Sequence, residues 1–393
     1  MRCPGKRMTK AKNLKRLFLL KPRITFLNHG SFGATPRPVF QAYQNWQKEL
    51  ERQPVEFLGR RHNHLMRDAR AALAGYLGTA AENIVYTQNV TISLNMAARS
   101  LKLGPGDEVL STQHEYGAVD RMWRFLAGEQ GFSYIRQEIR LPLETKDLAA
   151  EDFWRGVTDR TRVICLSHIT SPTAMILPVE EIVAKARQKG ILTVIDGAHG
   201  PGQIPLNLDR LDPDFYGGNL HKWLMAPKGS GFLYARPSAQ ALLKPLVVSW
   251  GKELPFSSGC PFIDDNEWLG TRDVAAFLAV PEAIRFQADH DWDTVREECH
   301  RLAAKTQAEI CRLTGMPPLH SRADGWFAQM FAAPLPGETN LDRLKERLYK
   351  EYQIEVPLIE WNDWKLIRVS VQGYNTPADM KRLLTALEKL LPG

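Results

Sequence analysis

The sequence predicts an α/β fold in which a large domain with a mainly parallel sheet is followed by a smaller α+β domain. Between about residue 70 and residue 235, short apolar and β-branched runs alternate with helix-like segments. That alternation is typical of a parallel sheet covered by helices on both faces. After about residue 280, longer helical segments and two separate strand-like runs replace it. A chain of 393 residues is long enough for two such domains.

Five runs are expected to form buried strands of the large domain: IVYT (84–87), EVLS (108–111), VICLS (163–167), LTVID (192–196) and GFLYA (231–235). The segment 179–190 has apolar residues spaced by three or four and a closing glycine, which predicts a helix between two of them.

The smaller domain is predicted from the C-terminal third of the chain. We expect a helical stretch at 281–313, strands at 326–331 and 365–372, and a helix at 340–352 between them. A final amphipathic helix would place one apolar face inward, made of Met380, Leu383, Leu384, Leu387 and Leu391. The domain boundaries expected are therefore 1–20 for a basic leader without fixed structure, 21–280 for the large domain and 281–393 for the small one.

The net charge of +7 comes from the leader. Its first sixteen residues contain seven basic side chains and no acid, and the rest of the 51 basic residues balance the 44 acidic ones. A neutral body argues against a nucleic-acid partner, although binding through the leader stays open as an alternative. The apolar run LFLL after the leader is too short for a signal peptide, and no run approaches the ~18 residues of a membrane helix.

The five cysteines are scattered and form no CxxC pair. This pattern argues against a disulfide framework and against a metal site, and it favours a reducing, cytoplasmic location.

The most informative stretch of the chain is 193–222, which contains Asp196 at the end of an expected strand and Lys222 within GGNLHKW. Pyridoxal phosphate chemistry needs this pair, because a lysine holds the aldehyde as a Schiff base and an acid keeps the pyridine nitrogen protonated. Both residues also have structural explanations, since most lysines are solvated and an aspartate often caps a helix.

Three further groups follow predicted strands, where ligands of open α/β sheets bind. Thr91, in QNVTISLN (88–95), would open a helix that binds a phosphate, or the segment is a plain N-cap. Tyr116, or His114 as the alternative, would stack on a flat ring unless it belongs to the core. The third group, His168, Thr170 and Ser171, could form hydrogen bonds near such a ring, and His199 lies with Asp196 at the end of the expected strand 192–196.

Five segments together resemble the class V aminotransferases, the fold-type I group of pyridoxal phosphate enzymes that includes cysteine desulfurases and isopenicillin N epimerase. They are VIDGAHG (194–200), LDPDFYGGNLHKWLMAPKGSGFLYAR (211–236), FLNHGSFGATPRPV (26–39), GTRD (270–273) and RVSVQGYNT (368–376). The resemblance covers nearly the whole chain and is strongest to the isopenicillin N epimerase-like branch.

The resemblance implies a role for each matching residue. Lys222 would carry the cofactor, Asp196 would pair with the pyridine nitrogen, and Tyr116 would stack on the ring. Arg368 would bind the α-carboxylate of an amino-acid substrate, and Asn28 would lie on the substrate side. His168, Ser171 and His199 would lie near the ring, while the phosphate would be surrounded by Asn89, Thr91, Asn219, His221 and, from the partner subunit of a homodimer, Thr271.

One departure from the desulfurase pattern limits the chemistry. Desulfurases have a nucleophilic cysteine shortly before the substrate arginine, whereas residues 355–368 here contain none. The resemblance therefore implies removal of the Cα proton, followed by epimerisation or C–S bond cleavage. Transamination remains an alternative, as does an inactive descendant that only binds ligands. Substrate selection is expected from Arg60, Arg61 or His62 and from the loop Trp361–Trp364.

Overall fold

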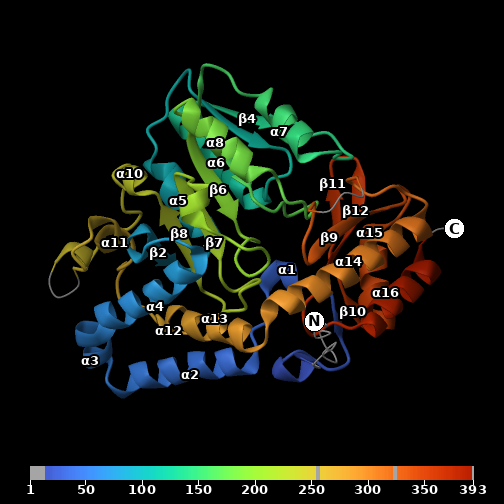
Figure 1. Cartoon of the computed structure of the whole chain (residues 1–393), viewed down its shortest axis with the longest axis horizontal. Coiled ribbons are helices and arrows are strands. Elements are labelled where there is room, and N and C mark those ends of the chain that lie inside the picture. Colours follow the sequence, from blue (N-terminus) through green and yellow to red (C-terminus); the bar gives the residue numbers. More distant parts are fainter. Residues whose placement is uncertain (1–13, 254–256, 322–324, 392–393) are drawn as a thin grey trace, which may run out of the picture.

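A computed structural model describes residues 14–253, 257–321 and 325–391 of the chain. Its large domain is built on a seven-stranded sheet with the order β2-β8-β7-β6-β5-β3-β4, in which only β8 runs antiparallel to its neighbours (Figure 1). The strands are β2 (Ile84–Thr87), β3 (Glu108–Thr112), β4 (Ser133–Gln137), β5 (Thr161–Ser167), β6 (Leu192–Gly197), β7 (Phe215–Asn219) and β8 (Gly231–Ala235).

Helices cover both faces of this sheet, because successive side chains of a strand point to opposite faces. In β5, Val163 and Cys165 pack with α5 (Val90–Ser100) and α6 (Gly117–Gln130). Ile164 and Leu166 face the other way, toward α4 (His62–Leu77), α7 (Lys146–Trp154) and α8 (Val179–Gln188). The mainly parallel α/β architecture predicted from the sequence is confirmed.

All five predicted strands form, but β4 and β7 were not predicted. β7 has the sequence FYGGN, and two adjacent glycines read as a turn because glycine weakens an isolated strand. Tertiary packing requires them here, since a Cβ on Gly217 would lie 3.0 Å from atoms of Ser93 and Val90 in α5. β4 is an edge strand whose side chains are partly exposed, so its pattern is less apolar than that of its neighbours.

The C-terminal domain has a three-stranded antiparallel sheet of order β11-β12-β9, with β9 at Met330–Leu335, β11 at Leu358–Trp361 and β12 at Trp364–Ser370. The strand expected at 326–331 was misplaced, because Trp326 and Phe327 are buried but lie in the loop before β9. The helical stretch expected at 281–313 is two helices, α13 (Val280–Asp289) and α14 (Trp292–Thr314), which are separated where Asp291 has a φ of 51°. This domain is completed by β10 (Ile354–Glu355), α15 (Leu341–Tyr352) and α16 (Pro377–Leu390).

The N-terminal segment packs on the C-terminal domain. β1 (Thr25–Phe26) pairs in parallel with β10, and α1 (His29–Phe32) follows it. In Figure 1, α1 lies beside β9, and the backbone N–H of Gly30 donates a hydrogen bond to Ser370 at the end of β12.

The leader expected at 1–20 is wrong for its last residues. Leu14 and Phe18 are buried, and the Phe18 ring packs edge-on against Tyr374 at 4.8 Å. Basic neighbours obscured this short apolar pattern in the sequence. The first thirteen residues of the expected leader lie outside the described part of the chain.

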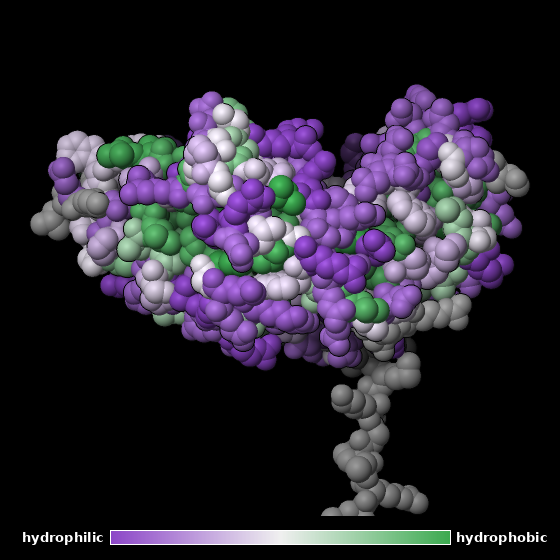
Figure 2. Space-filling model, turned by 90° about the horizontal axis from the view of Figure 1, so that it is seen from above, coloured by the Kyte–Doolittle hydropathy of each residue, from purple (hydrophilic) through white to green (hydrophobic). Residues whose placement is uncertain are grey.

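The remaining helices surround the large domain or connect its strands. Within the described residues, no helix combines the length and apolar character that crossing a membrane requires. On the face that Figure 2 shows, hydrophilic residues predominate and a notch indents the outline between two lobes. The connecting elements are η1 (Leu14–Leu17), α2 (Arg37–Arg52), α3 (Pro54–Glu56), the π-helical turn η2 (Phe57–Arg61), η3 (Ala81–Asn83), α9 (Leu208–Leu211), α10 (Pro237–Gln240), η4 (Trp250–Lys252), α11 (Pro261–Asn266) and α12 (Ala275–Leu278).

Candidate active site

The candidate site lies at the carboxyl ends of β5, β6 and β7, where the neighbouring strands bring distant residues together. Ser167 pairs with Asp196, and Asp196 pairs with Gly217. β7 therefore ends beside Asp196, and the segment after it leads directly to Lys222. This strand pairing brings Asp196 and Lys222 together although they are far apart in the sequence.

Lys222 holds its amine close to the imidazole of His199, with Nζ 3.2 Å from Nε2. Burial lowers the pKa of Lys222 to about 8, the negative charge of Asp196 opposes this shift, and the positive charge of Arg368 adds to it. About a tenth of the Lys222 amine is therefore uncharged at pH 7, far more than for an ordinary lysine, and the uncharged form is the one that attacks an aldehyde.

Asp196 is almost fully buried at the end of β6. Its Oδ1 accepts a hydrogen bond of 2.9 Å from the backbone N–H of Ala198. Burial raises the pKa of Asp196, while the Ala198 hydrogen bond and Lys222 lower it. No described residue donates a hydrogen bond to Oδ2. This second oxygen can therefore accept a hydrogen bond from a ligand.

His199 is buried between Lys222 and Trp223. Its Nδ1 accepts a hydrogen bond of 3.2 Å from the indole N–H of Trp223. Burial lowers the pKa of His199 well below its ordinary value, and the nearby charges of Lys222 and Arg368 lower it further. The imidazole is therefore uncharged at neutral pH.

The N-terminus of α5 forms the second half of the site. Asn89 is the N-cap of this helix, and its side-chain oxygen accepts from the backbone N–H of Ile92 at 3.1 Å. Asn219 accepts from the N–H of Val90 at 3.0 Å. Both amide NH₂ groups and the Thr91 hydroxyl have no hydrogen-bond partner among the described residues, so three donors surround a helix N-terminus suited to an anion.

His221 lies at the edge of this group of donors. Its Nδ1 lies 3.2 Å from the carbonyl oxygen of Ser230. Because a carbonyl oxygen can only accept, Nδ1 carries the ring proton and donates a hydrogen bond to it. Burial lowers the pKa of His221 to about 4, and the positive charge of Lys222 contributes to the shift.

Arg368 projects from β12 of the C-terminal domain and is 5% exposed. Its Nη1 donates to the backbone oxygen and the hydroxyl of Ser171 at 2.6 and 3.1 Å, and Nη2 donates to Ser31 at 3.2 Å. Its Nε is buried without a hydrogen-bond partner, and no described carboxylate pairs with the guanidinium. Burial lowers the pKa of Arg368 to about 10. A buried cation without a counter-ion is costly unless a ligand supplies one.

Comparison with known proteins identifies the family. The model of the family described as "Aminotransferase class-V" matches residues 27–330. The chain belongs to the class V aminotransferases. An isopenicillin N epimerase from Amycolatopsis lactamdurans is 36% identical over 96% of this chain and 98% of its own length, and one from Streptomyces clavuligerus is 33% identical over 95% and 96%. A putative L-cysteine desulfhydrase from Oryza sativa subsp. japonica is 30% identical over 94% of this chain and 83% of its own length.

A solved structure supports the fold. A cysteine desulfurase from Escherichia coli superposes with a TM-score of 0.81 at 21% identity, and the match covers 98% of both chains. The large α/β domain with a smaller C-terminal domain is thus the fold-type I arrangement. Isopenicillin N epimerase-like members form the branch of the family that this chain resembles in sequence.

Pyridoxal phosphate is the cofactor of this family, and the residues present fit it. The accessible oxygen of Asp196 suits a protonated ring nitrogen, and Lys222 suits the aldehyde. The donors left over at Asn89, Thr91 and Asn219 suit a phosphate. A backbone contact shapes this pocket, because a Cβ on Gly231 would lie 2.8 Å from Cα of Asn89.

The two aromatic candidates after β3 differ in position. Tyr116 is the N-cap of α6, is 46% exposed and lies near enough to Arg368 to influence it electrostatically. His114 is fully buried, with its ring nitrogens against Thr173 at 2.9 Å and the Ile139 carbonyl at 3.3 Å. Only Tyr116 is available for a ligand.

Lys222, Asp196, His199 and Arg368 form what we call the Lys222 cluster, and the side chains of several predicted residues have no described contact with it. His168 reaches the cluster through its backbone N–H, which donates to the carbonyl oxygen of Asp196 at 2.9 Å. The His168 ring is hydrogen-bonded to Tyr216 at 3.1 Å, and Thr271 lies in an exposed loop. Arg61 pairs with Glu49 at 2.7 Å. The other residues proposed for substrate selection also have structural contacts, since His62 packs on Trp268 and Trp361 donates to the Gln113 carbonyl.

Asn28 lies on the Arg368 side of the site. Its Oδ1 accepts from the hydroxyl of Ser31 at 2.5 Å, and that hydroxyl in turn accepts from Arg368. Asn28 also donates to Glu355 at 3.3 Å.

Sequence reasoning missed His29, Ser31 and Trp223. His29 Nε2 lies 3.0 Å from the Lys222 carbonyl oxygen, and His29 Nδ1 lies 2.9 Å from the Tyr374 hydroxyl. The signal for His29 and Ser31 was their place inside the matching segment 26–39, and the signal for Trp223 was its place next to Lys222. No sequence pattern revealed which of their atoms would meet.

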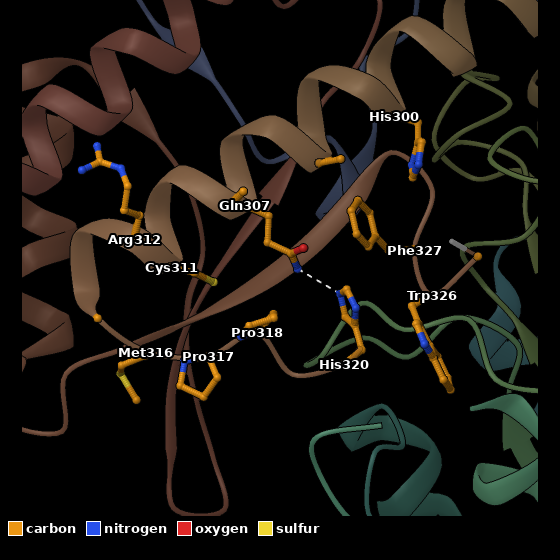
Figure 3. Close-up of a pocket in the computed structure, with 14 residues that line it drawn as sticks. His300, Gln307, Cys311, Arg312, Met316, Pro317, Pro318, His320, Trp326 and Phe327 are labelled. Carbon is orange, nitrogen blue, oxygen red and sulfur yellow. Dashed lines mark hydrogen bonds between the residues drawn. The ribbon is translucent and has the colours of Figure 1, made fainter. Parts of the chain in front are cut away.

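A cavity of about 770 Å³ lies elsewhere, between α14 and the segment 315–327 (Figure 3). Gln307 and His320 face each other across it, with Nε2 atoms 3.1 Å apart. No residue of the Lys222 cluster lines this cavity, so it is separate from the candidate active site.

Proposed function

We propose that this enzyme binds an α-amino acid, or a derivative that keeps the α-carboxylate, and removes its Cα proton with Lys222. The observation that carries the proposal is the buried guanidinium of Arg368, which has no described counter-ion. Its positive charge also lowers the pKa of Lys222, so the two side chains share one site. Its planar group of donors matches a carboxylate in two-point geometry.

Each residue of the cluster has one task in this proposal. Arg368 orients the substrate by its carboxylate, and the amine of Lys222 accepts the proton as a general base. Asp196 would keep the ring nitrogen protonated through the negative charge of its carboxylate, and the Ala198 N–H, its one described hydrogen-bond donor, leaves Oδ2 available for this contact. When bound, pyridoxal phosphate would supply an electron sink for the pair that the departing proton leaves behind.

The step after proton removal is epimerisation or cleavage of a C–S bond at Cβ. Relatives named isopenicillin N epimerase and L-cysteine desulfhydrase support both outcomes. Cleavage needs only a leaving group, whereas epimerisation needs a second proton donor on the opposite face. Tyr116 is our candidate for that donor, because its phenol is exposed and lies near enough to influence Arg368.

Sulfur transfer through a protein persulfide is disfavoured by the positions of the cysteines. Cys165 is fully buried, and burial raises the pKa of its thiol well above the ordinary value. Cys299 and Cys311 belong to α14, and Cys260 precedes α11. None of these four has a described contact with Lys222 or Arg368.

The test is one screen of amino acids and cysteine conjugates with three simultaneous measurements: exchange of α-deuterium, release of pyruvate, and formation of the cognate keto acid. We expect α-deuterium exchange together with pyruvate or with inverted substrate. Keto acid as the main product would instead establish transamination. A colourless protein that takes up no pyridoxal phosphate would contradict the enzyme proposal, and an inactive family member that only binds ligands would be the remaining explanation.

Two variants give the controls. Lys222→Ala should lose all three signals and the covalent label left by borohydride reduction of the bound cofactor. Arg368→Lys keeps the charge but loses the two-point geometry, and we expect kcat/KM to fall about 10- to 100-fold. The loss should vanish with amino-acid amides, which lack the carboxylate. An equal loss with amides would contradict the role of Arg368.

A further inference from the structure

His199 has two hydrogen-bonding neighbours of different chemistry, and they determine where its proton lies. The indole N–H of Trp223 can only donate, so the Nδ1 atom 3.2 Å away must accept with its lone pair. An imidazole without charge has one proton, which is then on Nε2. Nε2 is the atom that lies 3.2 Å from Nζ of Lys222.

We propose that Trp223 is a positioning residue for the cofactor lysine, because its indole N–H holds His199 as the Nε2–H tautomer. An Nε2–H group donates to the lone pair of a free amine. It cannot accept a proton from an ammonium group. The hydrogen-bond chain from Trp223 through His199 to Lys222 therefore favours the uncharged lysine, the form that reacts with an aldehyde.

The surroundings of Trp223 keep its indole in place. The residue is fully buried, and its backbone carbonyl accepts from Gln287 of α13 at 3.0 Å. The His29 ring packs against it at 5.0 Å. On the other side, Gly202 has a φ of +87°, and a Cβ there would lie 2.3 Å from the carbonyl carbon of Trp223. Contacts from three separate segments, at Gln287, His29 and Gly202, thus fix the direction in which the indole N–H of Trp223 points.

The charged groups near the hydrogen-bond chain from Trp223 to Lys222 do not all act in one direction: Arg368 favours the uncharged lysine and Asp196 opposes it. Burial is the largest cause that lowers the pKa of His199, and Lys222 and Arg368 oppose a positive charge on it further. His221 and His29 would do the same only when protonated. His221 and His29 are themselves uncharged near neutral pH, since burial is the largest cause that lowers their pKa values to about 4 and about 3.

The proposal deepens the proposed function and rests on Lys222 as the cofactor lysine. Its first test needs no catalysis: the apoenzyme is labelled with ¹⁵N-histidine, and the tautomer of His199 is read from its ring nitrogen shifts by NMR. The signal is assigned from its loss in His199→Gln. We expect a protonated Nε2 and an unprotonated Nδ1 near neutral pH. A proton on Nδ1 in the wild-type apoenzyme overturns the proposal, whatever any variant does.

The second test uses Trp223→Phe, which keeps an aromatic ring and removes the donor. Nδ1 is then free to carry the proton and Nε2 to accept from the ammonium form of Lys222. We expect the midpoint pH for acylation of Lys222 by acetic anhydride, followed by mass spectrometry, to rise by about one pH unit. An unchanged midpoint in a folded variant contradicts the proposal.

Trp292→Phe is the matched control. Trp292 is also buried, and its indole nitrogen has no hydrogen-bond partner among the described residues. The Trp292→Phe variant should lose packing contacts without changing the midpoint pH for acylation of Lys222. An equal shift in both variants would show a general loosening of the fold and would also contradict the role of Trp223. Failure of the proposed function is distinguishable, because borohydride reduction would then leave the cofactor on no residue or on a different one.

Discussion

At the scale of single residues, the site depends on polar groups that the protein interior leaves without partners. Arg368 has a buried Nε and no described counter-ion, and the amides of Asn89 and Asn219 keep free donors. Such groups cost folding free energy, so each indicates a ligand that restores the missing hydrogen bonds. Lys222 contributes a similar cost, because burial lowers its pKa from 10.5 to about 8.

That cost predicts a pH-dependent stability of the apoenzyme. Between about pH 8 and pH 10.5 the unfolded chain holds a proton on Lys222 that the folded chain has lost, so stability rises with pH through this window. Lys222→Met removes the cost. The variant apoenzyme should be more stable than wild type at pH 7, by at most on the order of 3 kcal/mol, and the difference should shrink as the pH approaches 10.5.

Urea unfolding of both apoenzymes at pH 7 and pH 10.5 measures this difference. Lys185→Met serves as the control, because Lys185 is partly exposed and pairs with Glu181 at 2.6 Å on the surface of α8. It should change stability by less than about 1 kcal/mol. A Lys222→Met apoenzyme that is less stable than wild type at pH 7 would show that burial of the amine is not costly.

At the scale of elements, the loop that carries Lys222 is held by close backbone contact with the N-terminal segment. Gly33 ends α1 with a φ of +70°, and a Cβ there would lie 1.9 Å from the carbonyl oxygen of His221. Both the backbone conformation and the contact exclude a side chain. Gly75, near the end of α4, is exposed with open space around its Cα.

The same substitution should therefore have opposite effects at these two glycines. Gly33→Ala forces the Lys222 loop away and should destabilise the protein by about 2 kcal/mol or more, with weaker binding of pyridoxal phosphate. Gly75→Ala should stabilise it by about 0.5–1 kcal/mol with cofactor affinity unchanged. Thermal unfolding and cofactor titration by visible absorbance check both. Equal effects at the two positions would refute the close contact.

At the scale of the whole molecule, the site joins three parts of the chain. β6 and β7 of the large domain supply Asp196 and lead to Lys222, and β12 of the small domain supplies Arg368. The N-terminal segment connects them, because His29 contacts both the Lys222 carbonyl and the Tyr374 hydroxyl. Thr271 is exposed in the single chain, and we propose that it completes the phosphate site of a partner subunit in a homodimer.

Hybrid dimers test that arrangement. Thr271→Glu would place a carboxylate beside the phosphate, and Lys222→Ala removes the base, so each homodimer should be nearly inactive. A hybrid with one chain of each kind has one site with Lys222 and an intact partner Thr271. Its activity should recover to about half of the wild-type value per dimer. Hybrids that stay as inactive as the homodimers would place Thr271 in the site of its own chain or outside any site.

The alternation of buried strands and amphipathic helices predicted the α/β class and five strands of the sheet, because period and apolar content are local properties. β7 was not predicted, since its two glycines are required by tertiary contacts, Gly217 with α5 and Gly218 with Phe232 of β8, rather than by any local preference. In the small domain, the aromatic pair Trp326–Phe327 resembled a strand but packs as a buried loop.

The sequence by itself determined the family, the cofactor lysine and the acid as candidates, since the matching segments carry them in order. Only the tertiary structure decided which atoms meet. It left Arg368 buried without a counter-ion among the described residues, placed His114 in the interior and Tyr116 at the surface, and aligned Trp223 with His199 and Lys222. The physical reason is that pKa values and tautomers depend on burial and hydrogen-bond direction, which strand pairing and domain packing set between residues far apart in the chain.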